Sequence, residues 1–251
     1  MFWKLLSKRN RHSAENWDIK TMFGPNLNFA TTEAYKLLRT NVMFSFTNDG
    51  KGHVVGVTSA IQSEGKSSTA CNLAYALAEA GCKVLLLGAD LRKPSVASKL
   101  GIARTPGLTN VLVGKFAWEE VLQKCDIAPK MDIIAAGDIP PNPSELLSSE
   151  RMSEIVEELR KEYEYIIVDL PPVTVVSDAI AVSKCLDGVV VVVRGGVSDQ
   201  LMLSEAKRQL DMVNVRILGF VYRDQNAIGK KYNYRYRRKY YKYYREYSKK
   251  N

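Results

Sequence analysis

A polar loop at residues 60–67, with the sequence AIQSEGKS, has side chains whose types and spacing suit phosphate binding. It matches the pattern G-x-x-x-x-G-K-[ST], except that Ala60 stands at the first glycine. In this pattern the lysine, here Lys66, reaches the β- and γ-phosphates of a nucleotide, and the hydroxyl of Ser67 binds Mg²⁺. Backbone N–H groups of residues 62–67 could cradle the phosphates. A plain strand–helix turn is the alternative, but we predict a nucleotide site.

Two aspartates could complete such a site, since each follows an apolar run. Asp90 comes directly after VLLLGA, and Asp169 is the last residue of YIIVD. Ligands of open α/β sheets bind at the carboxyl ends of the strands, where both aspartates are expected. We predict that Asp169 belongs to the Mg²⁺ shell through water, and that Asp90 holds Mg²⁺ or accepts a proton. For each residue the alternative is an aspartate without a functional role.

The apolar pattern predicts the elements that position these residues. A helix from Ser68 to about Gly81 begins at the loop, so its free N–H groups and its dipole would face a bound phosphate. Strands are expected at 53–59, 83–88, 131–136, 165–169, 188–194 and 216–222. Because helical segments separate them, we predict an α/β fold, a doubly wound and mostly parallel sheet of the P-loop type with both faces covered.

The remaining elements are predicted from caps, prolines and periodicity. Thr31 or Thr32 would cap a helix that extends from Glu33 to Phe46. The three prolines of 140–143 predict an extended connection that cannot be helical. Further helices are expected as two short ones within 107–124, one from Ser148 or Ser149 to about Tyr163, one near 177–186 and one at 199–214.

Composition predicts three parts: a loose leader at 1–30, a nucleotide-binding domain at 31–226 and a disordered tail at 227–251. No apolar run approaches the length of about 18 residues that a membrane-spanning helix needs. The four cysteines form no C-x-x-C pair and no cluster with histidine, so we expect reduced thiols and a cytoplasmic location.

The positive charge of the chain is concentrated at its end. Residues 230–251 contain ten Lys or Arg and one acid, whereas the rest of the chain is balanced, although the whole has a net charge of +9. A neutral body argues against a nucleic-acid-binding face on the domain, so we expect no specific nucleic acid partner. The alternatives for the tail are single-stranded nucleic acid or an acidic membrane. Its eight tyrosines instead favour phosphorylation, which would reverse its charge.

These motifs occur together in one family. The loop at 60–67, the segment VLLLGADLR, the segment IIVDLPP and the tyrosine-rich end resemble those of bacterial tyrosine kinases of the capsular and exopolysaccharide type, which are similar to MinD/ParA-type P-loop ATPases. The stretch PPNPSELL at 140–147 resembles the same family. The resemblance implies a protein-tyrosine kinase that uses ATP and Mg²⁺, with Lys66, Asp90 and Asp169 as catalytic residues and Ser67, Asp90 and Asp169 at the metal.

The resemblance also assigns nucleotide contacts and acceptors. The nucleotide-binding residues would be Gln62, Ser63, Glu64, Gly65, Lys66, Ser67, Ser68 and Arg223. The phosphate acceptors, modified by a neighbouring subunit, would be Tyr232, Tyr234, Tyr236, Tyr240, Tyr241, Tyr243, Tyr244 and Tyr247.

The family's ring-forming E-x-x-R-x-x-R helix corresponds here to Glu33, Lys36 and Arg39. From spacing alone a solvated helix face is favoured over a contact between subunits. The resemblance implies a homo-oligomeric ring, a membrane adaptor of the polysaccharide co-polymerase type that activates the kinase, and a cognate tyrosine phosphatase. It places the kinase at the inner face of the membrane, where it would regulate polysaccharide synthesis and export.

The chain departs from the family pattern at a position that matters for catalysis. The family has D-x-D where this chain has Gly88 and Asp90, and the missing aspartate is implicated in Mg²⁺ binding and in deprotonating tyrosine. Lesser departures are Ser63, often glycine, and Arg223, often an asparagine that contacts adenine. A catalytically weak ATP-binding regulator is therefore one alternative. A MinD/ParA-like switch ATPase is another, but its extra lysine is absent, since residues 60 and 61 are Ala and Ile.

Overall fold

The computed structural model describes residues 23–47 and 50–224. Its centre is a seven-stranded sheet with the strand order β3-β4-β2-β5-β1-β6-β7. All neighbouring strands are parallel except β3, which pairs antiparallel with β4. The strands are β1 (His53–Ser59), β2 (Val84–Gly88), β3 (Gln123–Lys124), β4 (Met131–Ile134), β5 (Tyr165–Asp169), β6 (Gly188–Arg194) and β7 (Ile217–Arg223). The predicted doubly wound α/β fold is confirmed.

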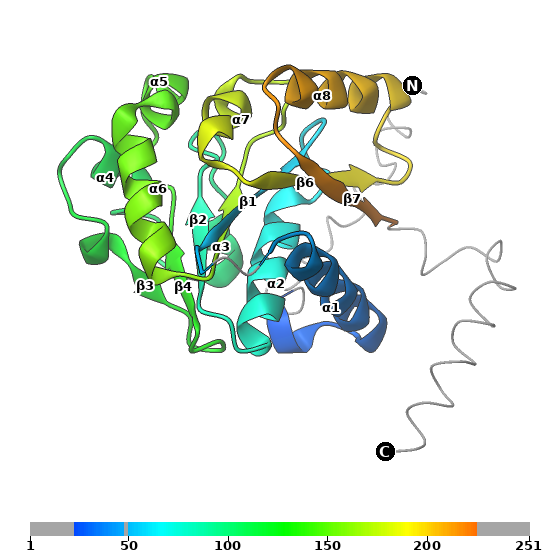
Figure 1. Cartoon of the computed structure of the whole chain (residues 1–251), viewed down its shortest axis with the longest axis horizontal. Helices are drawn as coiled ribbons and strands as arrows, with labels where there is room; N and C mark the ends of the chain where they lie inside the picture. Colours follow the sequence, from blue (N-terminus) through cyan, green and yellow to red (C-terminus); the bar gives the residue numbers. More distant parts are fainter. Residues whose placement is uncertain (1–22, 48–49, 225–251) are drawn as a thin grey trace, which may run out of the picture.

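Helices cover both faces of this sheet (Figure 1). Helices α1 and α2 pack on one face, and α6 and α8 pack on the other, each with its own buried apolar cluster. The helices are α1 (Phe29–Phe44), α2 (Lys66–Glu79), α3 (Val96–Leu100), α4 (Leu108–Leu112), α5 (Pro143–Ser148), α6 (Glu150–Glu162), α7 (Asp178–Ala181) and α8 (Gln200–Met212), with the 3-10 turns η2 (Gly24–Asn26), η3 (Glu119–Val121) and η4 (Ser183–Cys185).

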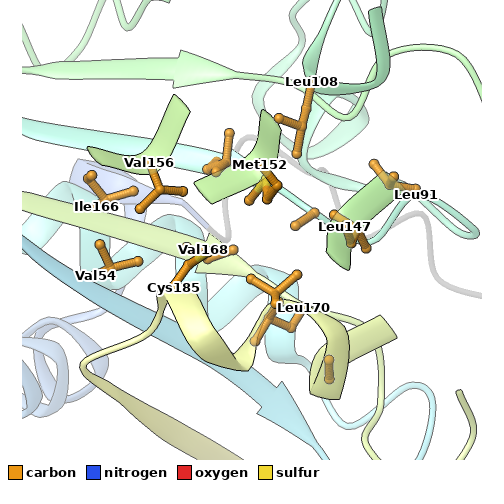
Figure 2. Close-up of a cluster of buried hydrophobic side chains, with 14 of the residues drawn as sticks. Val54, Leu91, Leu108, Leu147, Met152, Val156, Ile166, Val168, Leu170 and Cys185 are labelled. Atoms are coloured by element: carbon orange, nitrogen blue, oxygen red, sulfur yellow. The ribbon is translucent and has the colours of Figure 1, made fainter. Parts of the chain in front are cut away.

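The apolar residues of α6 recur at helical spacing and pack against strand β5 of the sheet. Met152 and Val156 lie one turn apart on α6 and contact the sheet above Ile166 and Val168 of β5 (Figure 2). All four side chains are at most 1 % exposed. Full burial of side chains of this size contributes roughly 1.5–3 kcal/mol each, so this layer holds α6 against the strand that ends at Asp169.

The N-terminal boundary differs from the prediction. Asn28, not Thr31 or Thr32, caps α1, and its side chain accepts a hydrogen bond of 3.0 Å from the backbone N–H of Thr31. Asparagine is among the best N-cap residues, so the helix starts at Phe29. Residues 23–30, predicted to belong to a loose leader, form η2 and the first helical residues, and buried Gly24 donates its N–H to Asn72 Oδ1 of α2.

Two local predictions are wrong. Of the two helices expected within 107–124, only α4 forms, and the second half is η3 followed by edge strand β3. Pairing of Gln123 and Lys124 with the edge of β4 outweighs the local helical pattern. Pro143 also belongs to a helix, because it is the first residue of α5, a position that needs no backbone N–H donor.

Candidate functional site

The phosphate-binding loop joins the central strand β1 to α2. Gly65 has φ 97° and precedes Lys66, the first residue of α2. A side chain there would be strained, which explains the glycine at this point of the loop. The N-terminus of α2 therefore points its unpaired N–H groups into the loop, as phosphate binding requires.

The structure brings together the four residues that were predicted to handle phosphate and metal. Lys66 Nζ lies 2.6 Å from Asp90 Oδ2 and 3.5 Å from the hydroxyl of Ser67. The neighbouring strands β2 and β5 place Gly88 opposite Asp169, so both aspartates lie at the same edge of the sheet. Asp90 is also fixed by the backbone N–H of Lys93, which donates to Oδ1 at 2.9 Å.

Asp169 is buried in an environment that suits a carboxylate bound to a cation. It is 1 % exposed, and neither carboxylate oxygen has a hydrogen-bond partner among the described residues that meets normal geometry. Burial raises the pKa of Asp169 from 3.8 to about 6, although the nearby charge of Lys66 lowers it in part. No group of three or more His, Cys, Asp or Glu within the described residues could hold a metal. Mg²⁺ at Ser67 and Asp169 would therefore depend on phosphate and water for its other ligands, which fits these residues.

A cavity of about 360 Å³ opens beside the loop. The predicted residues that line it are Gln62, Ser63, Gly65, Lys66, Ser67, Ser68 and Asp90. The side chain of Glu64 does not: it is fully buried, accepts a hydrogen bond of 2.8 Å from Ile61 N–H and accepts another from the Ser198 hydroxyl. Glu64 thus holds the shape of the loop, and only its backbone could serve a nucleotide.

Arg223 at the end of β7 lies directly beside the loop. A Cβ built on Gly65 would lie 1.4 Å from Arg223 Nη1, so the guanidinium occupies the space next to this glycine. Arg194 of β6 donates to the carbonyl of Ser63 at 2.8 Å. Ser63 has φ 64°, a conformation in which glycine, common in the family here, avoids strain. The loop is therefore tied to the ends of β6 and β7.

At Gly88 the fold leaves little room. A Cβ there would lie 3.1 Å from the backbone nitrogen of Ala136, closer than side chains usually approach. The position lies at the carboxyl end of β2, next to Asp169. It therefore contributes no carboxylate to the edge of the sheet where Lys66 and Asp90 meet.

The predicted oligomerisation residues make contacts within the chain. Lys36 Nζ lies 2.9 Å from Glu33 on the same helix. Arg39 Nη1 donates to the carbonyl of Ala76 at 3.1 Å, which joins α1 to the last turn of α2. The alternative of a solvated helix face fits the pair of Lys36 and Glu33, whereas Arg39 has an intramolecular contact that the sequence did not predict. The predicted acceptor tyrosines, Tyr232 to Tyr247, lie outside the described residues.

Sequence reasoning missed a second group of residues that line the cavity, and we call this group its second wall. This wall contains Arg92, Lys93 and Lys99 together with Pro172 and Val175. The run LRKP after Asp90 and the PP pair after Asp169 could have indicated it, because both follow the carboxyl ends of strands.

Across residues 23–47 and 50–224, no helix is long and apolar enough to span a membrane.

Comparison with known proteins agrees with this geometry. An AAA domain model matches residues 56–198. The tyrosine-protein kinase YwqD of Bacillus subtilis is 38% identical over 215 residues, covering 85% of this chain and 89% of YwqD. The kinase domain of the Escherichia coli tyrosine kinase Etk superposes with a TM-score of 0.74 at 31% identity, covering 78% of this chain and 77% of that one.

The septum site-determining protein MinD of Pyrococcus horikoshii shares the fold, with a TM-score of 0.58 at 22% identity over 67% of this chain and 69% of MinD. The similarity to MinD concerns architecture alone, whereas YwqD and Etk agree in sequence along most of the domain. The residues at 60–67, 90 and 169 and the relatives that share the surrounding sequence lead to one assignment: the chain belongs to the bacterial tyrosine kinase family of capsular and exopolysaccharide biosynthesis.

Proposed function

We propose that this chain transfers the γ-phosphoryl group of ATP to tyrosine, with Mg²⁺ as the required metal. One observation carries the proposal: Lys66 and Asp90 meet at 2.6 Å at the edge of a cavity, next to an orphaned and buried Asp169. This set provides a cation for phosphate, a candidate proton acceptor and a carboxylate for the metal.

In the proposed reaction the phenol oxygen of tyrosine forms a bond to the γ-phosphorus. The bond from that phosphorus to the bridging oxygen breaks, ADP leaves, and the phenol proton passes to a carboxylate. The amides at the start of α2 and Lys66 would stabilise charge on the phosphoryl oxygens. Mg²⁺ would be held by Ser67 and, through water, Asp169, and it would neutralise phosphate charge.

Asp90 is the proposed proton acceptor. A phenol has a pKa near 10 and needs a positioned base at neutral pH. Asp90 is bound by Lys66 and Lys93, so Lys66 must turn from Asp90 to the phosphates before Asp90 can act. This exchange would couple ATP binding to exposure of the base.

The acceptors would be the tyrosines of the tail, modified in trans within a ring that uses Glu33, Lys36 and Arg39. The family resemblance supports a membrane adaptor that recruits and activates the kinase at the inner face of the membrane, a cognate phosphatase, and a role in capsular or exopolysaccharide synthesis. Arg223, placed beside Gly65, is proposed to contact the nucleotide.

The test is incubation of the purified full-length chain with the adaptor tail, ATP and Mg²⁺, followed by mass spectrometry of the C-terminal peptides. We expect phosphotyrosine between 232 and 247, and none in Lys66→Met. Phosphotyrosine that persists in Lys66→Met would mean that the phosphate came from another enzyme.

A second candidate, a weak or silent ATP-binding regulator, is favoured by one observation: position 88 offers no carboxylate and Asp90 is engaged. It predicts ATP binding without phosphotyrosine, and activity in Gly88→Asp. Because Ala136 crowds position 88, a Gly88→Ala control would separate the effect of the carboxylate from that of packing. A switch ATPase would hydrolyse ATP without modifying tyrosine.

A further inference from the structure

The second wall of the cavity beside the loop contains residues to which no nucleotide role is assigned. They are the cations Arg92 and Lys99 and the apolar side chains of Pro172, Val175 and Val176, whereas the neighbouring Lys93 donates to Gln62 of the loop at 2.9 Å. We propose that this wall is the acceptor subsite: the phenol ring rests on the apolar residues while Arg92 binds the phosphoryl group that joins the phenol oxygen. This inference rests on the proposed kinase function and extends it to the tyrosine side of the reaction.

Arg92 is held rigidly at the cavity by a buried carboxylate. Its Nε and Nη2 donate to the two oxygens of Asp178 at 2.8 and 3.0 Å. The side chain of Asp178 is 0% exposed, whereas that of Arg92 is 43% exposed. Burial of a carboxylate is costly unless it is paired, so this fork fixes the plane of the guanidinium while leaving part of it open to the cavity.

Helix α5 also contributes to the pair of Arg92 and Asp178. The hydroxyl of Ser144 on α5 donates to Asp178 Oδ1 at 2.5 Å and lies 3.1 Å from the hydroxyl of Ser177. Arg92 is thus positioned by α5 and α7 at once. Asp178 and Ser144 act through Arg92 and are positioning residues, whereas Arg92 would touch the transferred group.

The apolar part of the wall is fixed relative to the phosphate-binding loop. The hydroxyl of Thr58 donates to the carbonyl of Pro171 at 2.7 Å, and that of Thr174 donates to the carbonyl of Ala60 at 2.6 Å. The backbone N–H of Val173 donates to Ser59 O at 2.9 Å. Val175, 48% exposed, therefore forms an apolar surface in the same cavity as Lys66. A planar aromatic ring suits such a surface.

Charge explains why Arg92 would act late in the reaction. The unmodified tail carries +9, so the charge of Arg92 offers its tyrosines no attraction before the transfer. A phosphotyrosine gains about −1.5 to −2 charges, which Nη1 of the guanidinium, the nitrogen that Asp178 and Ser144 do not use, can bind through charge-assisted hydrogen bonds. The subsite would thus favour the phosphoryl group after it has moved toward the acceptor.

Phenyl phosphate, a minimal phosphotyrosine, is the probe. Its binding to the full-length chain loaded with Mg-ADP would be measured by calorimetry. We expect Arg92→Gln and Val175→Asp each to weaken binding at least tenfold, with the affinity for ADP within twofold of the wild type. Arg151→Gln is the matched control, because this arginine of α6 pairs with exposed Glu154 and does not line the cavity.

Since Arg92→Gln leaves the buried Asp178 without its cation, the double variant Arg92→Gln with Asp178→Asn keeps the cluster neutral. It should fold and show the same loss of phenyl phosphate binding. The phosphotyrosine yield should fall at least tenfold in the same variants at saturating ATP.

Unchanged phenyl phosphate binding in the variants, or no binding to the wild type, would overturn the subsite. A loss of ATP affinity with phenyl phosphate binding intact would also overturn it, and would assign Arg92 to the nucleotide. If the wild type binds phenyl phosphate through Arg92 yet forms no phosphotyrosine, the subsite stands and the kinase function fails.

Discussion

The ion pair with Asp90 fixes the position of Lys66, the lysine proposed to bind phosphate. At 2.6 Å, with side chains 12% and 4% exposed, the pair is shielded from water and is stronger than a surface ion pair. In the proposed reaction ATP would replace Asp90 as the partner of Lys66. The residue that is proposed to accept the proton thus competes with the substrate for the same ammonium group.

This competition predicts the behaviour of Asp90→Asn. The variant frees Lys66, so its affinity for ATP should equal or exceed that of the wild type in a fluorescent nucleotide titration. Phosphotyrosine formation should fall about 10²–10⁴-fold, because the proton acceptor is lost. Parallel losses of ATP affinity and transfer would show instead that Asp90 serves only the binding of the nucleotide.

Asp169 predicts a pH dependence of stability. Its pKa is about 6 in the fold against 3.8 for the free group. Between these values the native state binds more protons than the unfolded state, so the free energy of unfolding falls as pH rises from about 4 to 6. The side chain introduced in Asp169→Asn does not titrate, so the variant lacks this loss of stability. Its free energy of unfolding, relative to that of the wild type, should therefore rise by about 2 kcal/mol from pH 4.5 to pH 7.5.

Urea unfolding of both proteins at the two pH values, without nucleotide or Mg²⁺, measures the difference. Comparison with the variant removes the contribution of all other titrating groups. A stability difference that does not change with pH would contradict the assigned environment of Asp169. Added Mg-ATP should reduce the difference, because Mg²⁺ held in part by ionised Asp169 would make the ligand bind the native wild type more tightly than Asp169→Asn.

At the scale of elements, the loop at 60–67 is held by parts of the chain far away in sequence. Ser198 and Arg194 bind Glu64 and Ser63, and Arg223 lies against Gly65. The end of β6, the segment that follows it and the end of β7, the last described strand before the tail, are therefore in contact with the loop. Helix α1 is joined through Arg39 to α2, the helix that begins at this loop.

Arg39 connects α1 to α2, so replacing it should affect the stability of the subunit. This effect can be separated from an effect on the proposed ring. Arg39→Ala should lower the free energy of unfolding by about 1 kcal/mol, since a charged hydrogen bond to Ala76 O disappears. Lys36→Ala should change it by less than about 0.5 kcal/mol, because its i,i+3 ion pair is partly exposed to water.

Chemical denaturation and light scattering of Arg39→Ala, Lys36→Ala and Glu33→Ala distinguish the two roles. If the helix forms the ring contact, Glu33→Ala should reduce the particle mass at nearly unchanged stability. A mass that changes only together with stability would reject the helix as the interface.

For the whole molecule, charge divides the chain into a neutral body and a basic end. Full phosphorylation of the eight tyrosines would change the net charge of residues 230–251 from +9 to roughly −3 to −7. We expect the unmodified protein to be retained on a cation exchanger and the phosphorylated protein to elute at much lower salt. Truncation after residue 226 should abolish retention, and equal retention of all three forms would place the basic surface elsewhere.

Much of this protein follows from sequence because the relevant signals are local. The alternation of apolar runs with helical segments determines the α/β class, and the spacing of Gly65, Lys66 and Ser67 determines a phosphate loop. Asp90 and Asp169 could be named because each ends an apolar strand. The tyrosine-rich end and its charge are properties of composition alone.

Only the tertiary structure decided which side chains face the cavity. Glu64 is adjacent to Gly65 yet turns inward to Ser198, and Arg39 reaches Ala76 rather than solvent. Arg92, Asp178 and Ser144 meet from three separate elements, and no local pattern encodes their contact. Pairing at a sheet edge and burial of a carboxylate depend on residues that are distant in sequence. The pairing of β3, the environment of Asp169 and the second wall of the cavity therefore follow only from the tertiary structure.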